Sequence, residues 1–336
     1  MNILVIGGTR FIGRHVVHKL LEAGHTVTLL NRGISNPGLF PNLTTIKADR
    51  DSDDIRNVPE LRRTWDSVID LCAYYPKGVD AVLKVLNGCA GRYIQCSSVS
   101  AYLATAQEDP TPILHEDDPL RTCSEPEATD TTMSSYGQRK AECERVAMAQ
   151  HSSGIPVIIL RPSLVFGAHD QTDRFAYWIW RAANRSPYIL PDEGLTITRR
   201  TYAPDLATAF VSAINSHQAL GNAYNIAETD PLSFRDTLYH LGNHLGTDSL
   251  RFGVSVSSDF LLKNNVAPWS DIPLWIPKTN LLADTYKSRK DLGFVSTPAT
   301  RALAEAADAF LSEKRTPKAG LSVAREQELL RLTNSV

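Results

Sequence analysis

Several features are scarce or missing in this sequence, and each absence narrows the class of protein. The 336 residues contain five cysteines, an odd number with no Cys-x-x-Cys pair, which favours reduced structural thiols over a disulfide framework. No apolar stretch is long enough to cross a membrane, and the apolar run at residues 1–6 is too short for a signal peptide. No His, Cys and Asp cluster has metal-ligand spacing. We therefore expect a cytoplasmic protein without a metal.

An excess of one charge sign is also missing. Lys and Arg total 35 against 37 Asp and Glu, which gives a formal net charge of -2, and no basic run stands out. General nucleic-acid binding is therefore disfavoured. Hydrophobic residues make up 43% of the chain and charged residues 21%, as in an ordinary globular protein.

Short apolar segments alternate with helical patterns through the first two thirds of the chain. The alternation predicts an α/β fold with a Rossmann-type, doubly wound parallel sheet. We predict strands at residues 2–6, 25–30, 44–47, 67–71, 92–96, 156–160 and 222–227, and helices at 12–23, 79–86, 135–150 and 204–214.

Two segments interrupt this rhythm. Residues 103–134 are rich in Pro, Thr, Asp and Glu and predict a long surface excursion, whereas residues 166–200 are aromatic and unlike an element of the sheet. Beyond the last predicted strand the pattern is helical. We predict a nucleotide-binding domain at 1–165 plus about 201–227, and a smaller helix-rich C-terminal substrate lobe at about 166–200 and 228–336.

The stretch GGTRFIG connects the first predicted strand to the first predicted helix. Its glycines let the backbone approach a pyrophosphate, and the helix N-terminus supplies free N–H groups and a positive dipole. The strand before it and the helix after it are the context that such a motif requires. We therefore predict a dinucleotide site that includes Gly7, Gly8, Thr9, Arg10, Phe11, Ile12 and Gly13.

The end of the second predicted strand bears on the choice of cofactor. An NAD site carries Asp or Glu there for the ribose 2′-hydroxyl, but this chain has Asn31 followed by Arg32. The guanidiniums of Arg32 and Arg10 suit a phosphate, so we predict NADP, with NAD as second choice. The alternative is that both arginines are solvated surface residues. Asp49 is expected to face the adenine ring.

A Ser, a Tyr and a Lys form a candidate catalytic set. Ser98 ends a predicted strand, and Tyr136 and Lys140 stand four residues apart on a predicted helix, hence on one face. A tyrosine titrates near ~10, and a neighbouring ammonium favours its phenolate form. This set suits hydride transfer between a nicotinamide and a ketone or secondary alcohol.

These motifs resemble the extended short-chain dehydrogenase/reductase superfamily, often labelled NAD-dependent epimerase/dehydratase. The segments VIGGTRFIG, ADRD, VIDLCAY, CSSVSAY, YGQRK, ILRPSLVFG, TYAPDLATAF and NAYNIAE follow the family's order over nearly the whole chain. The resemblance gives Ser98, Tyr136 and Lys140 the catalytic roles and implies a homodimer. It also implies a cofactor site that includes Ala73, Arg161, Pro162 and Ser163, to which we add the neighbouring motif residues Arg50, Leu71 and Cys72.

The chain departs from the family pattern at two points. Arg10 replaces the second fingerprint glycine, and Val99–Ser100 stand where sugar-nucleotide dehydratases carry Asp–Glu, which argues against dehydration. The family's 4-epimerases keep a tightly bound NAD, whereas an NADP site fits net reduction better. We therefore predict a reductase acting on a nucleotide-sugar or small specialised metabolite.

Two alternative functions remain open. One is a nucleotide-sugar epimerase with resident NAD. More narrowly, GGTRFIG, LLNRG, GAHDQTDRFAYW and LWIP resemble a bacterial subgroup of reductase-like members. The other alternative is an RNA-binding module with a vestigial site, because plastid relatives of this subgroup bind stem-loop RNA. The Ser98, Tyr136 and Lys140 set and the net charge of -2 argue against the second alternative.

The substrate side carries no motif of comparable specificity. We predict substrate contacts from polar and aromatic residues after the sheet, namely His169, Asp173, Arg174, Tyr177, Arg199 and Arg200. The alternative is structural: an Asp173–Arg174 ion pair, aromatic side chains in the lobe core, and two arginines beside a surface hairpin.

Overall fold

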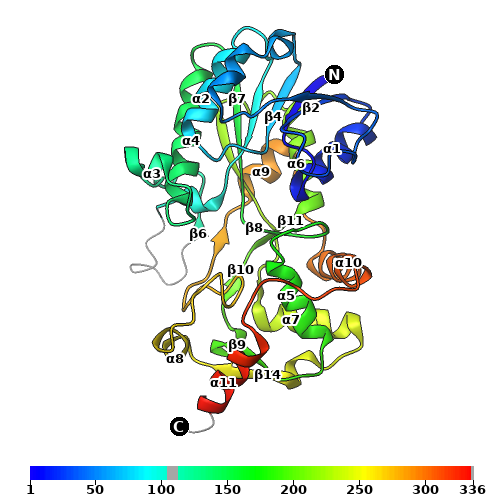
Figure 1. Ribbon diagram of the computed structural model, residues 1–336, viewed down its shortest axis with the longest axis vertical. Coiled ribbons are helices and arrows are strands. Elements are labelled where there is room, and N and C mark those ends of the chain that lie inside the picture. Colours follow the sequence, from blue (N-terminus) through cyan, green and yellow to red (C-terminus); the bar gives the residue numbers. More distant parts are fainter. Residues whose placement is uncertain (104–112, 334–336) are drawn as a thin grey trace.

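Seven strands form one parallel sheet in the computed structural model, which describes residues 1–103 and 113–333 (Figure 1). Their order across the sheet is β12-β7-β5-β4-β1-β2-β3, and every neighbouring pair is parallel. The predicted doubly wound Rossmann-type fold is therefore confirmed. The strands are β1 (Asn2–Ile6), β2 (Thr26–Asn31), β3 (Thr44–Lys47), β4 (Ser67–Asp70), β5 (Tyr93–Cys96), β7 (Val157–Pro162) and β12 (Asn222–Ile226).

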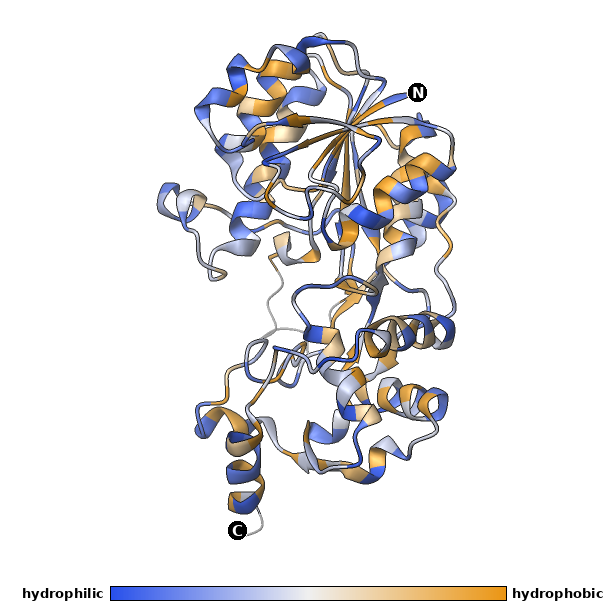
Figure 2. Cartoon of the chain, turned by 45° about the vertical axis from the view of Figure 1, so that its right-hand side comes forward, coloured by the Kyte–Doolittle hydropathy of each residue, from blue (hydrophilic) through white to orange (hydrophobic). Residues whose placement is uncertain are grey.

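Helices cover both faces of this sheet, because its strands are apolar on both sides. In Figure 2 the strands share their apolar colour with the inner sides of the helices. The side chains of Val17 and Phe210 belong to the core on one face, and those of Val82 and Cys143 to the core on the other. The first face holds α1 (Phe11–Glu22), α6 (Ala203–Asn215) and α9 (Tyr286–Leu292), and the second holds α2 (Pro76–Leu86) and α4 (Tyr136–His151).

The strand order reverses between β1 and β4. Strands β2 and β3 lie on one side of β1, and the strands that follow β3 in the chain lie on the other. In an open α/β sheet, ligands bind beyond the carboxyl ends of the strands at such a reversal. The glycine turn after β1 lies at this point.

The helix-rich C-terminal region has a hydrophobic core of its own. Trp178, Leu238 and Phe310 belong to one buried cluster that also includes Leu329 near the C-terminus. The helices of this region are α5 (Arg174–Ala183), α7 (Phe234–Leu245), α8 (Ser258–Lys263), α10 (Ala299–Ser312) and α11 (Val323–Thr333). Its short strands include β9 (Tyr188–Pro191) with β14 (Gly253–Val256), and β10 (Ile197–Thr198) with β13 (Leu232–Ser233).

Two further strand pairs connect the sheet to this lobe. They are β8 (Leu164–Phe166) with β11 (Arg200–Tyr202), and β6 (Ile113–Leu114) with β15 (Leu282–Ala283). The segment predicted as a surface excursion includes β6 and α3 (Glu125–Thr129), and its residues 104–112 lie outside the described part.

Among residues 1–103 and 113–333, no helix is both long and apolar enough to cross a bilayer. Within the same residues, no group of three or more His, Cys, Asp or Glu side chains is arranged to hold a metal ion. All five cysteines are free thiols.

Candidate active site

The turn between β1 and α1 is shaped for a close approach by a ligand. Gly7 and Gly8 have φ angles of +102° and +95°, in the region that favours glycine. A Cβ at Gly13 would lie 2.6 Å from the Cα of Gly8, so the helix packs against the turn only because residue 13 has no side chain. The first turn of α1 has neither an acidic residue nor a side-chain cap. Its free N–H groups fit the pyrophosphate of a dinucleotide.

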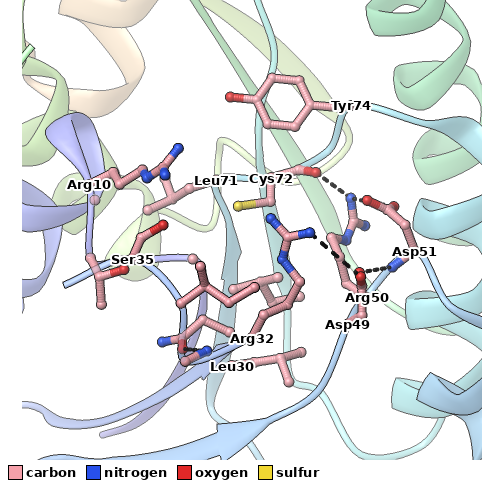
Figure 3. A pocket seen from close by; sticks show the side chains of 18 of the residues that line it. Arg10, Leu30, Arg32, Ser35, Asp49, Arg50, Asp51, Leu71, Cys72 and Tyr74 are labelled. Carbon is pink, nitrogen blue, oxygen red and sulfur yellow. Dashed lines mark hydrogen bonds and ion pairs between the residues drawn. The ribbon is translucent and has the colours of Figure 1, made fainter. Parts of the chain in front are cut away.

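A cavity of about 430 Å³ lies beside this turn, at the carboxyl ends of β1 to β4 (Figure 3). This volume is within the usual range for small-molecule sites. The structure brings thirteen of the predicted cofactor residues to the cavity wall, namely Gly7, Gly8, Thr9, Arg10, Phe11, Ile12, Gly13, Asn31, Arg32, Asp49, Arg50, Leu71 and Cys72.

Sequence reasoning missed several residues of the same wall. Ser35 and Asp51 follow the ends of β2 and β3, so strand topology alone could have indicated them. Tyr74 and Tyr75 follow β4 in the same way. Gln171 comes from the segment after β8, and no local pattern in the sequence signals its position.

The two arginines that we predicted to share a phosphate differ in their surroundings. Nη1 of Arg32 lies 3.7 Å from Oδ2 of Asp49, and both side chains are exposed (Figure 3). Within the described residues, the guanidinium of Arg10 has no hydrogen bond or ion pair. Asn31 accepts a hydrogen bond from the Gly33 N–H at 2.8 Å, so its oxygen supports the turn after β2.

Arg50 reaches the cavity wall, but its guanidinium is held by the protein interior. Nη2 donates to Oδ2 of Asp70 at 2.8 Å, and Nη1 donates to the carbonyl of Cys72. The Tyr93 hydroxyl also donates to Asp70, which is 0% exposed. Burial lowers the pKa of Arg50, but the attraction of Asp70 outweighs it and raises the pKa overall. This network fixes the backbone that forms the cavity floor.

The predicted catalytic residues lie on two elements that pack together. Tyr136 is the first residue of α4 and Lys140 lies one turn later. Ser98 begins the short helical turn at Val99–Ala101, and its Oγ accepts from the Ser100 N–H at 3.1 Å. A Cβ on Gly137 would lie 2.3 Å from the Ser100 carbonyl, so the start of α4 fits closely against this turn.

Lys140 is buried and directed by two backbone carbonyls. Its Nζ donates to the oxygen of Ala73 at 2.9 Å and to that of Cys96 at 2.6 Å. Burial lowers the pKa of this ammonium, but the attraction of the Tyr136 phenol and nearby thiols raises it overall. The raised pKa keeps the Lys140 ammonium charged close to Tyr136.

The structure places Arg161, Pro162 and Ser163 at the end of β7. Arg161 is buried, with Nη2 at 2.6 Å from Oε2 of Glu144 and Nη1 at 2.9 Å from the Tyr102 hydroxyl, so its guanidinium is engaged within the protein. The Oγ of Ser163 is buried without a hydrogen-bond partner in the described part of the chain. Ser163 is therefore the member of this trio with a free polar atom.

The predicted substrate residues are not brought together. Arg200 is 2% exposed and pairs with Glu228 at 2.9 Å, and Nη1 of Arg199 donates to the Ala283 carbonyl at 3.0 Å. Tyr177 is 1% exposed and belongs to the lobe core. The structure thus places Arg200 and Tyr177 among structural contacts.

Asp173 forms an ion pair, although its partner is Arg315 and not the adjacent Arg174. Two hydrogen bonds of 2.7 Å join the Arg315 guanidinium to the two carboxylate oxygens. Nε of Arg174 donates to the Thr172 hydroxyl, and Cζ of Arg174 lies 5.9 Å from the centre of the Trp269 ring. His169 lines a second cavity that adjoins the first, and burial lowers the pKa of its imidazole.

The sequence is similar to a known protein family and to individual members of known function. A model of the NAD dependent epimerase/dehydratase family matches residues 3–227. The chain is 28% identical over 255 residues to a 2'-dehydrokanamycin reductase of Streptomyces kanamyceticus, covering 73% of this chain and 67% of that protein. It is 27% identical over 246 residues to the chloroplast stem-loop binding protein of 41 kDa b of Arabidopsis thaliana, covering 69% of this chain and 60% of that protein.

A solved structure shows the same fold over most of the chain. UDP-glucuronic acid 4-epimerase from Bacillus cereus, in complex with NAD, superposes with a TM-score of 0.71 at 20% identity. The superposition covers 92% of this chain and 96% of that chain.

Proposed function

We propose that this chain, which belongs to the NAD dependent epimerase/dehydratase family, is an NADP-dependent reductase. It is an NAD(P)-dependent enzyme of the extended short-chain dehydrogenase/reductase class. Its substrate would be a ketone, or the corresponding secondary alcohol, on a nucleotide-sugar or small specialised metabolite. The observation that carries the choice of NADP is Arg10, whose guanidinium has no partner among the described residues and lines the same cavity as the neutral Asn31.

The residues that would hold the cofactor line the cavity beside the glycine turn. The free N–H groups at the start of α1 would bind the pyrophosphate, and Arg10 would bind a phosphate on the adenosine ribose. When bound, the nicotinamide supplies the hydride. A carboxylate in place of Asn31 would repel the extra phosphate, and the chain has none there.

The catalytic residues would control the proton and the carbonyl oxygen. Tyr136 would donate its phenolic proton to that oxygen while the carbonyl carbon accepts the hydride, so that the ketone becomes a secondary alcohol. Lys140 would stabilise the phenolate left on Tyr136, because its ammonium is buried and stays charged close to that residue. The Ser98 hydroxyl would donate to the carbonyl oxygen and orient it.

The reductase among the similar proteins supports net reduction as the reaction, whereas the epimerase structure supports the alternative. A nucleotide-sugar epimerase returns its hydride to the substrate and retains its cofactor. An arginine that is free to bind an additional phosphate favours NADP. NADPH is consumed in a net reduction and exchanges with the solution, unlike a resident NAD.

The experiment combines cofactor content with a Tyr136→Phe variant. The purified protein should carry no tightly bound NAD and should oxidise added NADPH when given 2'-dehydrokanamycin or a keto-sugar nucleotide. Tyr136→Phe should lower kcat about a hundredfold or more and leave the Kd for NADPH nearly unchanged. Tyr239→Phe, on an exposed lobe side chain, serves as the matched control. Resident NAD, or substantial activity in Tyr136→Phe, would contradict the proposal.

A further inference from the structure

A second cavity adjoins the nucleotide cavity on the outer side of the first turn of α1. The two cavities share the wall formed by Arg10, Phe11, Ile34, Ser35 and Gln171. The second cavity extends from this wall to the segment that follows α10, with a volume of about 510 Å³. The function proposed above does not use it.

Arg14 brings to this cavity a guanidinium without a partner among the described residues. It is the one partly buried arginine among the described residues whose guanidinium has no hydrogen bond or ion pair, and its Nε is buried without a partner. The fully buried arginines have carboxylates, as Arg181 has in Glu326 at 2.5 Å and Arg200 has in Glu228. A guanidinium partly withdrawn from water gains from an acceptor, and Arg14 has none among the described residues.

Arg10 is the N-cap residue of α1, and Arg14 lies in its first turns. They stand four residues apart at the N-terminal end of α1, and both line the second cavity. The helix dipole adds positive potential at this end. Two guanidiniums at a helix N-terminus suit a phosphate, with its several acceptor oxygens.

Within the described residues, no acidic side chain at this cavity forms a hydrogen bond or ion pair with Arg10 or Arg14. Glu313 accepts a hydrogen bond from Nε of Arg315 at 2.6 Å, and the same guanidinium binds Asp173, so both carboxylates are engaged by Arg315. Asp170 accepts two hydrogen bonds from Thr172 through one oxygen, and its other oxygen is buried without a partner. That oxygen is available to accept from a hydroxyl on the ligand or from a protonated phosphate oxygen.

From this geometry we propose that the second cavity binds a phosphate group, with Arg14 as its principal ligand and Arg10 shared with the nucleotide cavity. Two sources supply this chemistry. The phosphate is either the 2′-phosphate of a cofactor that reaches through the shared wall, in which case the inference rests on the proposed function, or a phosphate independent of the cofactor. Both sources require the Arg14 guanidinium.

The test uses the full chain and inorganic phosphate, with binding measured by isothermal titration calorimetry. Arg14→Gln should weaken phosphate binding by about tenfold or more, as expected for loss of a charge-assisted contact. Arg185→Gln, which removes an exposed arginine outside the cavity, should leave the affinity unchanged. Absence of phosphate binding to the wild type, or equal affinity in wild type and Arg14→Gln, would overturn the proposal.

Repeating the titration with saturating NADPH or NADH distinguishes the two sources. If the 2′-phosphate fills the cavity, NADPH abolishes phosphate binding and NADH does not. If the phosphate is independent, binding persists with either cofactor. Failure of cofactor binding would count against the proposed function alone, because the phosphate titration needs no nicotinamide.

A second readout avoids any variant that fails to fold. In the wild-type protein, phosphate should shift the ring resonances of His169, which lines the cavity, and leave those of exposed His217 unchanged. Equal shifts of both rings, or none, would contradict the site.

Discussion

Nη1 of Arg32 lies 3.7 Å from Oδ2 of Asp49, whereas Arg10 on the same cavity has no partner among the described residues. The carboxylate of Asp49 therefore competes with any phosphate for Arg32. Because both side chains of the pair are exposed, their mutual attraction is small and a phosphate can displace it. Arg10 is the stronger candidate for cofactor selection.

Asp49→Asn should raise the preference for NADPH over NADH by about threefold, since it releases Arg32 and removes a charge that repels the 2′-phosphate. The appropriate measurement is the Kd for NADH divided by the Kd for NADPH. A contact of Asp49 with the adenine would change both constants alike and cancel in this ratio. Asp80→Asn removes a carboxylate that pairs with Lys84 away from the cavity and should leave the ratio unchanged. A ratio lower in Asp49→Asn than in the wild type would refute the claim that Asp49 competes with the phosphate for Arg32.

Gly13→Ala should weaken binding of both cofactors and lower the free energy of unfolding by about 1–3 kcal/mol, because the new methyl group meets the backbone of Gly8. Urea unfolding and cofactor titration measure the two effects. Gly38→Ala is the matched control, because a Cβ there meets no atom within 4 Å. A Gly13→Ala protein with wild-type affinity would show that the turn tolerates a side chain.

Glu144→Leu should destabilise the protein by about 3–5 kcal/mol, because it leaves Arg161 buried without its carboxylate. Glu142→Leu, on the same helix, removes a partly exposed partner of Arg145 and should cost no more than about 1 kcal/mol. Chemical denaturation of both variants gives the comparison. Similar decreases in the free energy of unfolding of the two variants would argue against a buried ion pair between Arg161 and Glu144.

The acid stability of the protein should depend on His15. Burial lowers the pKa of this imidazole below its ordinary value of 6.5, although a hydrogen bond to the Ala168 carbonyl opposes the shift. As pH falls below 6.5 the unfolded chain takes up the proton first, so the free energy of unfolding decreases.

His15→Gln should therefore make the loss of stability below pH 6.5 less steep. Denaturant midpoints measured across this pH range provide the test. His217→Gln replaces an exposed histidine and should leave the slope unchanged. Equal slopes in wild type and His15→Gln would rule out His15 as the titrating group.

The parts of the molecule that the sequence predicted well depend on local patterns. The strand before Gly7 and the helix after Gly13 are both marked by neighbouring residues, and the spacing of Tyr136 and Lys140 places them on one helical face. Parallel topology then brings the ends of β1 to β4 to one edge, so most of the cavity wall follows from residue order.

The sequence did not reveal which charged groups pair over long distances. Asp173 binds Arg315 across 142 positions, whereas the predicted alternative partner was the adjacent Arg174. Arg200 is occupied by Glu228, and Arg50 by Asp70, through contacts that only the packed structure creates. An arginine in a motif therefore cannot be assigned to a ligand until its acidic neighbours are known.

The central claim is that Arg10 selects a cofactor with an additional phosphate. The most direct test is the equilibrium dissociation constant of the purified protein for NADPH and for NADH, in the wild type and in Arg10→Gln. We predict that the wild type binds NADPH about tenfold more tightly than NADH and that Arg10→Gln largely removes this preference. Equal or tighter binding of NADH by the wild-type protein would contradict the account.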